Sequence, residues 1–215
     1  MRSSRSSVQS LKQTVAPQQQ PVTLDDAKRH LRVDWPDDDA YIFDLINAAQ
    51  DWLESRTSRA LITQTLQGVW TLPKSPESQL RGLYANLGQE LTFWLPRTPL
   101  QSVSTVEIEK DLDVWQTLNL TTDYVVDADN DPQRVWLRAS AISYWAPTGA
   151  LINFMGVYAP RVRITYTAGY GDSSAKVPYS FRRALLQTIA YFYENREGNA
   201  PPESVLAGLD SVRNV

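Results

Sequence analysis

The sequence predicts an α+β fold, a helical frame with an inserted antiparallel β unit. Two long amphipathic segments, residues 38–57 and 178–194, lie on either side of a stretch that has no helical period. In the first segment, apolar residues recur at the i, i+3, i+4 and i+7 spacing that places them on one helical face. Between the two segments, short runs rich in Val, Thr, Tyr, Trp and Ile are typical of strands.

The first long helix is expected over residues 38–57. Its apolar face is formed by Ile42, Leu45, Ile46, Ala49, Trp52 and Leu53. On the opposite, solvated face we expect Asp44, Gln50, Asp51 and Glu54. The three aspartates at residues 37–39 begin the helix, where carboxylates cap free backbone N–H groups and favour the positive end of the helix dipole. A magnesium cluster is the alternative reading of these aspartates.

Shorter helices complete the frame. Thr23 is followed three residues later by an acid, a capping-box pattern that predicts a helix over residues 23–31. Pro178 stands at the first position of the second long helix, where proline is favoured, and Gly198 with the two prolines after it ends that unit. Residues 204–209 are expected to form one further helical turn.

The β unit is expected over about residues 63–167. Its predicted strands, each bounded by turn residues, are 63–72, 90–95, 103–109, 114–120, 124–127, 134–138 and 161–167. The clearest hairpin joins 103–109 to 114–120. The stretch 74–88 is predicted to be an irregular loop.

Composition excludes several classes of protein. The 215 residues carry a formal net charge of -3, whereas a general nucleic-acid binder normally has a basic excess. The chain has no cysteine, so disulfides, thiolate nucleophiles and cysteine metal sites are excluded. No apolar run reaches the roughly 20 residues that span a bilayer, and no secretory signal precedes the fold. We expect a soluble intracellular protein without membrane contact.

No catalytic, metal-binding or cofactor-binding residues are predicted. His30, the one histidine, stands at the polar end of a short helix, where we expect it to be solvated. Asp127, Asp129 and Asp131 have the spacing that opens a calcium loop, but proline and arginine replace the required glycine and glutamate. A polar turn between strands is the preferred reading, and a weak cation site is the alternative. Gly169 and Gly171 predict a turn between strand and helix.

Residues 1–21 form a polar N-terminal arm of different composition. Arg2, Arg5 and Lys12 give the arm a charge of +3 with no acid, so the remainder carries -3 minus +3, or -6. Such a segment is expected to be extended and disordered when alone. It is either a solubilising tail or an arm that docks on another chain.

Seven tryptophans are more than a chain of this size requires. Trp52 is expected in the core of the frame. Aromatic side chains on strands and loops are either half-buried or part of an interface. The candidate interface residues are Arg2, Arg5, Lys12, Trp115, Trp145 and Tyr158.

An ordered set of segments resembles the head-tail connector family of tailed bacteriophages, also called adaptor or head-completion proteins. The segments are 22–34 (VTLDDAKRHLRVD), 37–42 (DDDAYI), 58–65 (SRALITQT), 95–103 (LPRTPLQSV), 167–172 (TAGYGD) and 193–197 (YENRE). The resemblance covers residues 22–198, leaving out the arm and a C-terminal tail, 199–215. It implies the longer branch of the family, with a β insertion between early and late helices.

What the resemblance implies is a structural virion protein and not an enzyme. Copies would form a ring, typically twelvefold, beneath the portal protein at the capsid vertex, after assembly in the host cytoplasm. The ring would extend the DNA channel without binding DNA specifically and would carry the tail or a second connector protein. No cofactor is implied. A carbohydrate- or protein-binding β module of a phage tail and a small hydrolase are the alternatives.

Overall fold

The computed structural model describes residues 8–71, 91–111, 113–138, 141, 161–196 and 200–209. The chain has the predicted α+β class and divides into two compact units. The helical unit comprises Ala16–Gln64 and Ala168–Val215, and the β unit comprises Met1–Val15 and Thr65–Thr167. Among the helices of the described residues, none combines the length and apolarity that crossing a membrane requires.

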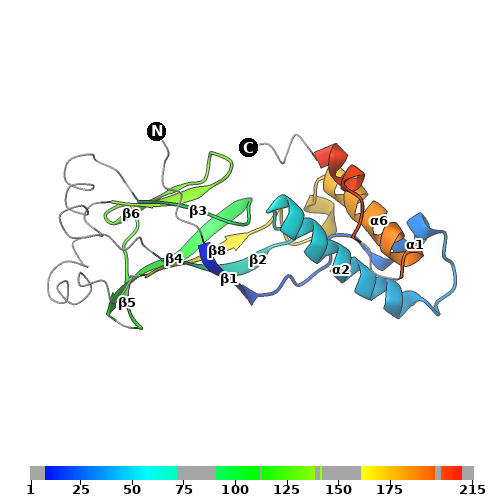
Figure 1. The fold of residues 1–215 in the computed structure, drawn as a ribbon, viewed down its shortest axis with the longest axis horizontal. Helices are drawn as coiled ribbons and strands as arrows, with labels where there is room; N and C mark the ends of the chain where they lie inside the picture. Colours follow the sequence, from blue (N-terminus) through cyan, green and yellow to red (C-terminus); the bar gives the residue numbers. More distant parts are fainter. Residues whose placement is uncertain are drawn as a thin grey trace. The chain divides into compact units, whose positions relative to one another are not determined.

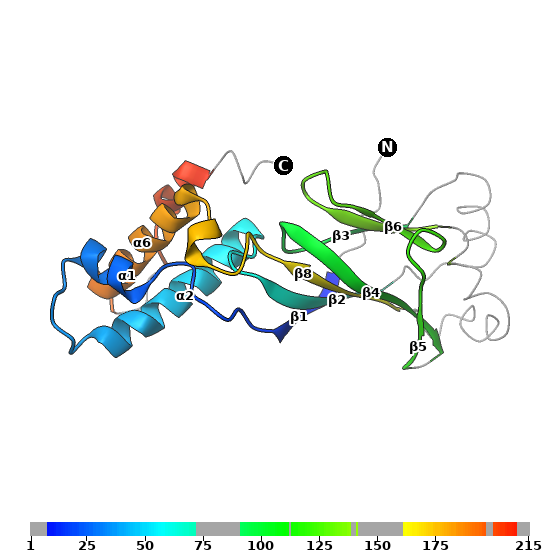
Figure 2. The same cartoon turned by 180° about the vertical axis from the view of Figure 1, so that it is seen from behind.

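The helical unit is built on two long helices, α2 (Asp39–Thr57) and α6 (Tyr179–Glu194), which lie side by side in both views (Figures 1 and 2). The short helix α1 (Leu24–Leu31) contacts both of them, and the 3₁₀ turn η2 (Glu203–Leu209) packs on α6. A second 3₁₀ turn, η1, spans Ser174–Lys176. The fully buried side chains of this core include Ala27, Ile42, Ile46, Ala49, Leu53, Leu61, Phe181, Leu185 and Ile189.

The two predicted helix starts have different outcomes. Thr23 caps α1 as predicted, because its hydroxyl accepts a hydrogen bond from the Asp26 backbone N–H at 3.1 Å. The prediction that an aspartate side chain caps α2 is wrong, since Asp38 stands at the N-cap position without a side-chain cap bond. Its backbone is not extended there (φ -94°, ψ 2°), and an extended N-cap is what directs the side chain to the first-turn N–H groups. Pro178 also lies one residue before α6 instead of at its first position.

The predicted polar face of α2 is only partly solvated. Glu54 is 2% exposed and Gln50 is 7% exposed, so for these two residues the prediction is wrong. Ser58, in the left-handed conformation, reverses the chain, and the following segment folds back on the helix. The Glu54 carboxylate accepts bonds from the Leu61 N–H at 2.9 Å and from the Gln64 amide at 3.0 Å. Trp52, which was expected in the core of the helical unit, is only partly buried and packs against that core.

The turn after the last strand also holds this returning segment. Gly169 has φ +136°, and a Cβ there would lie 2.6 Å from the backbone of Ile62 and of Thr63. The Thr63 N–H donates to the Gly171 carbonyl at 3.0 Å. Only a residue without a side chain permits this close approach of two backbones. The predicted turn at Gly169 and Gly171 is therefore confirmed, and it clamps two distant parts of the chain together.

The β unit contains two antiparallel sheets, and every predicted strand is present. One sheet has the order β1-β2-β8-β4-β5 and the other β3-β7-β6. The strands are β1 (Val8–Val15), β2 (Gln64–Thr71), β3 (Leu91–Trp94), β4 (Leu100–Asp111), β5 (Val114–Thr117), β6 (Tyr124–Asp127), β7 (Arg134–Leu137) and β8 (Arg161–Ala168). The predicted hairpin is β4–β5. The predicted loop 74–88 lies outside the described residues.

Alternation along the strands defines the core of this unit. β2 and β8 bury every second side chain, as expected for strands with one face on a core. Trp70 of β2 meets Phe93 of β3 edge to face, with ring centroids 5.7 Å apart, so the two sheets pack on each other. Gly68 precedes Trp70 on the same face, and the indole lies where a side chain at Gly68 would stand.

The arm is where the sequence prediction fails most clearly. Residues Val8–Val15 were expected to be disordered when alone, but they form β1, an edge strand paired antiparallel with β2. The ladder uses backbone N–H and C=O groups, which a polar sequence supplies as well as an apolar one. Composition therefore did not reveal it.

Replacing Glu54 by glutamine is expected to lower the free energy of unfolding by about 1–3 kcal/mol, because a side-chain amide has one acceptor oxygen and leaves a buried donor without its partner. The matched control is Asp51→Asn, an exposed position on the same helix, for which we expect a change within about 0.5 kcal/mol. Urea unfolding of both variants measures the difference. Equal losses in the two variants would contradict the structural role of Glu54.

Candidate functional site

The outer face of the five-stranded sheet carries an ionic patch. β8 buries Val162 and Ile164 and presents Arg161 and Arg163 on its other face. Arg163 binds Glu107 of β4 with two parallel hydrogen bonds, of 2.7 and 2.9 Å. Two parallel bonds fix the orientation of the guanidinium plane in addition to pairing its charge.

Two further acids and a tryptophan complete this patch. Arg161 donates to Glu109 at 2.7 Å and to Asp113 at 2.7 Å, and Glu109 is fully buried. Trp115 of β5 lies directly opposite Glu109 in the ladder. The Arg163 guanidinium stands 4.2 Å and the Arg161 guanidinium 5.4 Å from the centre of the Trp115 ring. We call Glu107, Glu109, Asp113, Trp115, Arg161 and Arg163 the arginine patch.

The positive charges of the arginine patch are balanced within the patch. Its guanidinium groups are already bound by carboxylates, and the patch holds three acids for two arginines. Aromatic and arginine side chains held rigidly on strands are the residues enriched where protein surfaces meet.

The outer face of the three-stranded sheet carries a second surface that sequence reasoning missed. The Arg134 guanidinium lies between two indoles, 5.2 Å from the centre of Trp94 and 5.1 Å from that of Trp136. Trp94 pairs with Arg134 across the β3–β7 ladder, and Trp136 lies two residues along β7 on the same face. We call these three residues the tryptophan–arginine stack. The sequence contains one signal for it, the Arg134-x-Trp136 alternation.

Asp127 binds the arginine of the tryptophan–arginine stack. Its carboxylate accepts bonds from the Asn130 amide at 2.8 Å and from Arg134 Nε at 2.9 Å. The Asn130 bonds, followed by those of Arg134, lower the pKa of Asp127 from its ordinary value. Asp127 thus belongs to a polar turn between β6 and β7, as the sequence predicted.

In the helical unit, Asp38 organises an aromatic cluster. It accepts bonds from the Tyr193 hydroxyl at 2.6 Å and from Trp35 Nε1 at 3.3 Å. The bond from Tyr193 lowers the pKa of Asp38, and the same bond raises the pKa of Tyr193. Arg196 stacks on Tyr41 and Tyr193 at 4.9 and 5.7 Å.

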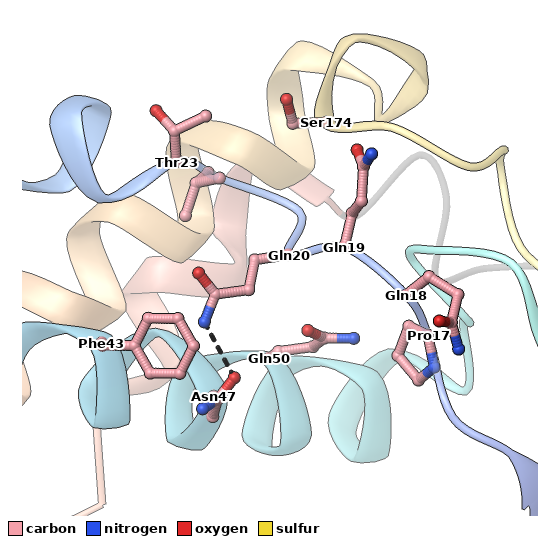
Figure 3. Close-up of a pocket in the computed structure, with 10 residues that line it drawn as sticks. Pro17, Gln18, Gln19, Gln20, Thr23, Phe43, Asn47, Gln50 and Ser174 are labelled. Carbon is pink, nitrogen blue, oxygen red and sulfur yellow. Dashed lines mark hydrogen bonds between the residues drawn. The ribbon is translucent and has the colours of Figure 1, made fainter.

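A pocket of about 440 Å³ lies between α2 and the segment that precedes α1 (Figure 3). Its lining has no charged side chain and consists of Pro17, Gln18, Gln19, Gln20, Val22, Thr23, Phe43, Asn47, Gln50 and Ser174. The Gln20 amide reaches down to Asn47 of α2 at 3.0 Å, whereas Gln19 points the opposite way.

The structure does not bring together the two sequence-predicted interface residues that it describes, Trp115 and Lys12. Trp115 belongs to the arginine patch, and Lys12 is exposed on β1, at the opposite edge of the sheet. Arg2, Arg5, Trp145 and Tyr158 lie outside the described residues. His30 is exposed, as expected. Within the ranges that the structure describes, no three His, Cys, Asp or Glu side chains are grouped to hold a metal ion.

Residues 21–108 match the family described as "Phage gp6-like head-tail connector protein". Over this stretch the chain is similar to that family. The stretch includes α1, α2, β2 and β3 and most of β4, so the match crosses from the helical unit into the β unit. The resemblance seen in the sequence is thereby confirmed over these residues. A comparison with curated proteins finds no match.

Solved structures extend the likeness of fold to nearly the whole chain. A chain of the virion of a native gene transfer agent particle is 23% identical with a TM-score of 0.68, covering 95% of each chain. A chain in the neck of the native particle, computed with C12 symmetry, is 22% identical with a TM-score of 0.66 and 96% coverage of each chain. A chain in the neck of the empty particle, computed with C6 symmetry, is 21% identical with the same TM-score and coverage. The shared fold includes both helical frame and β insertion.

The lowered pKa of Asp127 predicts a pH-dependent contribution to stability. The folded carboxylate holds its proton less tightly than the unfolded one, whose pKa is about 3.9, so the contribution is complete above that value and is lost as the pH falls through the lower folded pKa. We expect Asp127→Asn to be destabilised relative to the wild type at pH 7 and this gap to narrow by about pH 3. Urea unfolding across this range tests it.

The matched control is Asp129→Asn, an exposed position in the same turn. Its unfolding free energy should follow that of the wild type at every pH. A gap between Asp127→Asn and the wild type that stays constant down to pH 3 would contradict the assigned ion pair.

Proposed function

We propose that this protein is a neck component of a tailed-phage-like particle, a connector that forms a ring beneath the portal. The observation that carries the proposal is the head-tail connector match over residues 21–108, supported by a fold shared with two neck chains over 96% of their length. The protein then works by binding and assembly and not by turnover, since the matched family is structural. Its place is the capsid vertex, between head and tail.

The ring is proposed to be twelvefold, in line with the C12 symmetry of one neck that contains a chain of this fold. A ring of identical subunits needs two different complementary surfaces on each copy, which meet head to tail and close by rotation. The β unit offers rigid aromatic and arginine groups at two separate places, the arginine patch and the tryptophan–arginine stack. We assign the lateral contacts to the β unit and the rigid frame to the helical unit.

The negative charge of the chain outside the arm supports a channel that does not bind DNA tightly. The chain outside the arm carries -6, and phosphates are attracted chiefly by unpaired basic side chains. In the arginine patch and the tryptophan–arginine stack, Arg134, Arg161 and Arg163 are bound by carboxylates. DNA is therefore expected to pass without specific binding.

The remaining contacts are assigned by position. Residues 1–7 and the tail 199–215 stand at the ends of the chain and are the proposed contacts to the portal protein and to the tail or next connector. Neither a carbohydrate-binding β module nor a hydrolase requires two long helices flanking a β insertion.

Electron microscopy of the purified protein mixed with the portal protein of its own particle tests the ring. We expect a ring of one copy number on one end of each portal, and particles lacking this protein should contain DNA but no tail. Free portals beside monomers at every protein concentration, or tailed particles formed without this protein, would overturn the proposal.

Replacing Trp115 by alanine is expected to reduce the ring population about tenfold, the effect of losing roughly 1.4 kcal/mol at a central aromatic contact. Val114→Ala, an exposed position on the same strand, is the matched control and should assemble like the wild type. Sedimentation velocity measures the ring fraction, and thermal unfolding checks that both variants are folded. Normal assembly of a folded Trp115→Ala would remove the arginine patch from the lateral contacts.

A further inference from the structure

β1 is attached to the β unit mainly through its backbone, with side-chain bonds from the Thr14 hydroxyl to the Thr65 carbonyl and from the Thr71 hydroxyl to the Gln9 amide oxygen. It pairs with β2 from Val8 opposite Trp70 to Val15 opposite Thr65. Six of its eight side chains are exposed, and the other two are only half-buried. A ladder of backbone bonds does not depend on which copy of the chain supplies the strand. β1 would therefore pair equally well with β2 of a second copy.

The segment that joins β1 to the helical unit has the properties of a hinge. β1 ends at Val15, the last residue of the first stretch of the β unit, and Ala16 begins the helical unit. The chain is anchored again at Pro21 and Val22, which are buried. Between these points, residues 17–20 line the pocket of about 440 Å³, and Gln20 is bonded to Asn47 of α2 (Figure 3). A short proline-containing connection of this kind is where strands are exchanged between protomers.

We propose that β1 is exchanged between copies: Val8–Val15 of one subunit adds to β2 of the next and replaces that subunit's own β1. The inference rests on the proposed ring. The donor arm and the acceptor edge of β2 are different surfaces, so the exchange can run in one direction from copy to copy and close into the proposed ring. In such a ring the β2 edge of every subunit is paired with the β1 strand of its neighbour.

Charge and reach are consistent with this partner. The arm carries +3 and the remainder of each copy carries -6, so an arm is attracted to a neighbouring body. The five hinge residues span at most about 17 Å when extended, so an arm reaches only the β2 of an adjacent subunit.

The absence of cysteine from the sequence makes a direct test possible. Ser10 lies opposite Val69 in the β1–β2 ladder, and directly opposed residues of an antiparallel pair lie about 4.5–5.5 Å apart at Cα, within the range of a disulfide. Ser10→Cys chains and affinity-tagged Val69→Cys chains are co-expressed, purified and oxidised. We expect a covalent heterodimer at least about tenfold more abundant than with the control pair, Ser10→Cys and Thr117→Cys, which joins β1 to the opposite edge strand.

The double variant Ser10→Cys/Val69→Cys supplies the converse measurement. Exchange predicts a covalent series of multiple chains on a denaturing, non-reducing gel. A single band of internally closed monomer, together with no heterodimer above the control, overturns the exchange. Micrographs of the same samples separate the two proposals: rings without cross-linked chains overturn the exchange alone, whereas the loss of both rings and cross-links removes the proposed function as well.

Discussion

The fold depends on a clamp in the helical unit that holds both ends of the β insertion. The chain leaves α2 at Ser58, turns back, and is fixed where the buried Glu54 carboxylate accepts the Leu61 N–H and the Gln64 amide. The returning chain after β8 is fixed at the same segment, because Gly169 and Gly171 lie against Ile62 and Thr63. The two chain segments that lead into and out of the β insertion are therefore fixed next to each other within the helical unit.

The two units beyond this clamp have separate cores. The helical unit buries a continuous apolar core between α2 and α6, which fixes the clamp. The β unit has its own core of two packed sheets, which leaves the outer faces of both sheets for polar and aromatic side chains. Arginine, carboxylate and tryptophan groups are bound to one another on those faces within the chain itself, so the proposed contacts would immobilise few additional side chains.

Much of the fold could be predicted from the sequence, because hydrophobic periodicity is a local property. The strands were predicted from short runs rich in Val, Thr, Tyr, Trp and Ile between turn residues, and the helices from their apolar faces and from the Thr23 cap. The burial of Glu54 could not be predicted, since it depends on a chain reversal after the helix and not on the helix itself. β1 was missed because an edge strand held by backbone bonds has no hydrophobic signature. The tryptophan–arginine stack depends on the register of β3 against β7, which no local pattern encodes.

The central claim is that assembly occurs through the β unit while the helical unit serves as its support. Hydrogen–deuterium exchange of the free chain and of the assembled ring tests this directly. The account predicts that assembly slows exchange in the strands that carry the arginine patch and the tryptophan–arginine stack, with little change in the cores of α2 and α6. Protection confined to the helical unit, with the β unit unchanged, would contradict it.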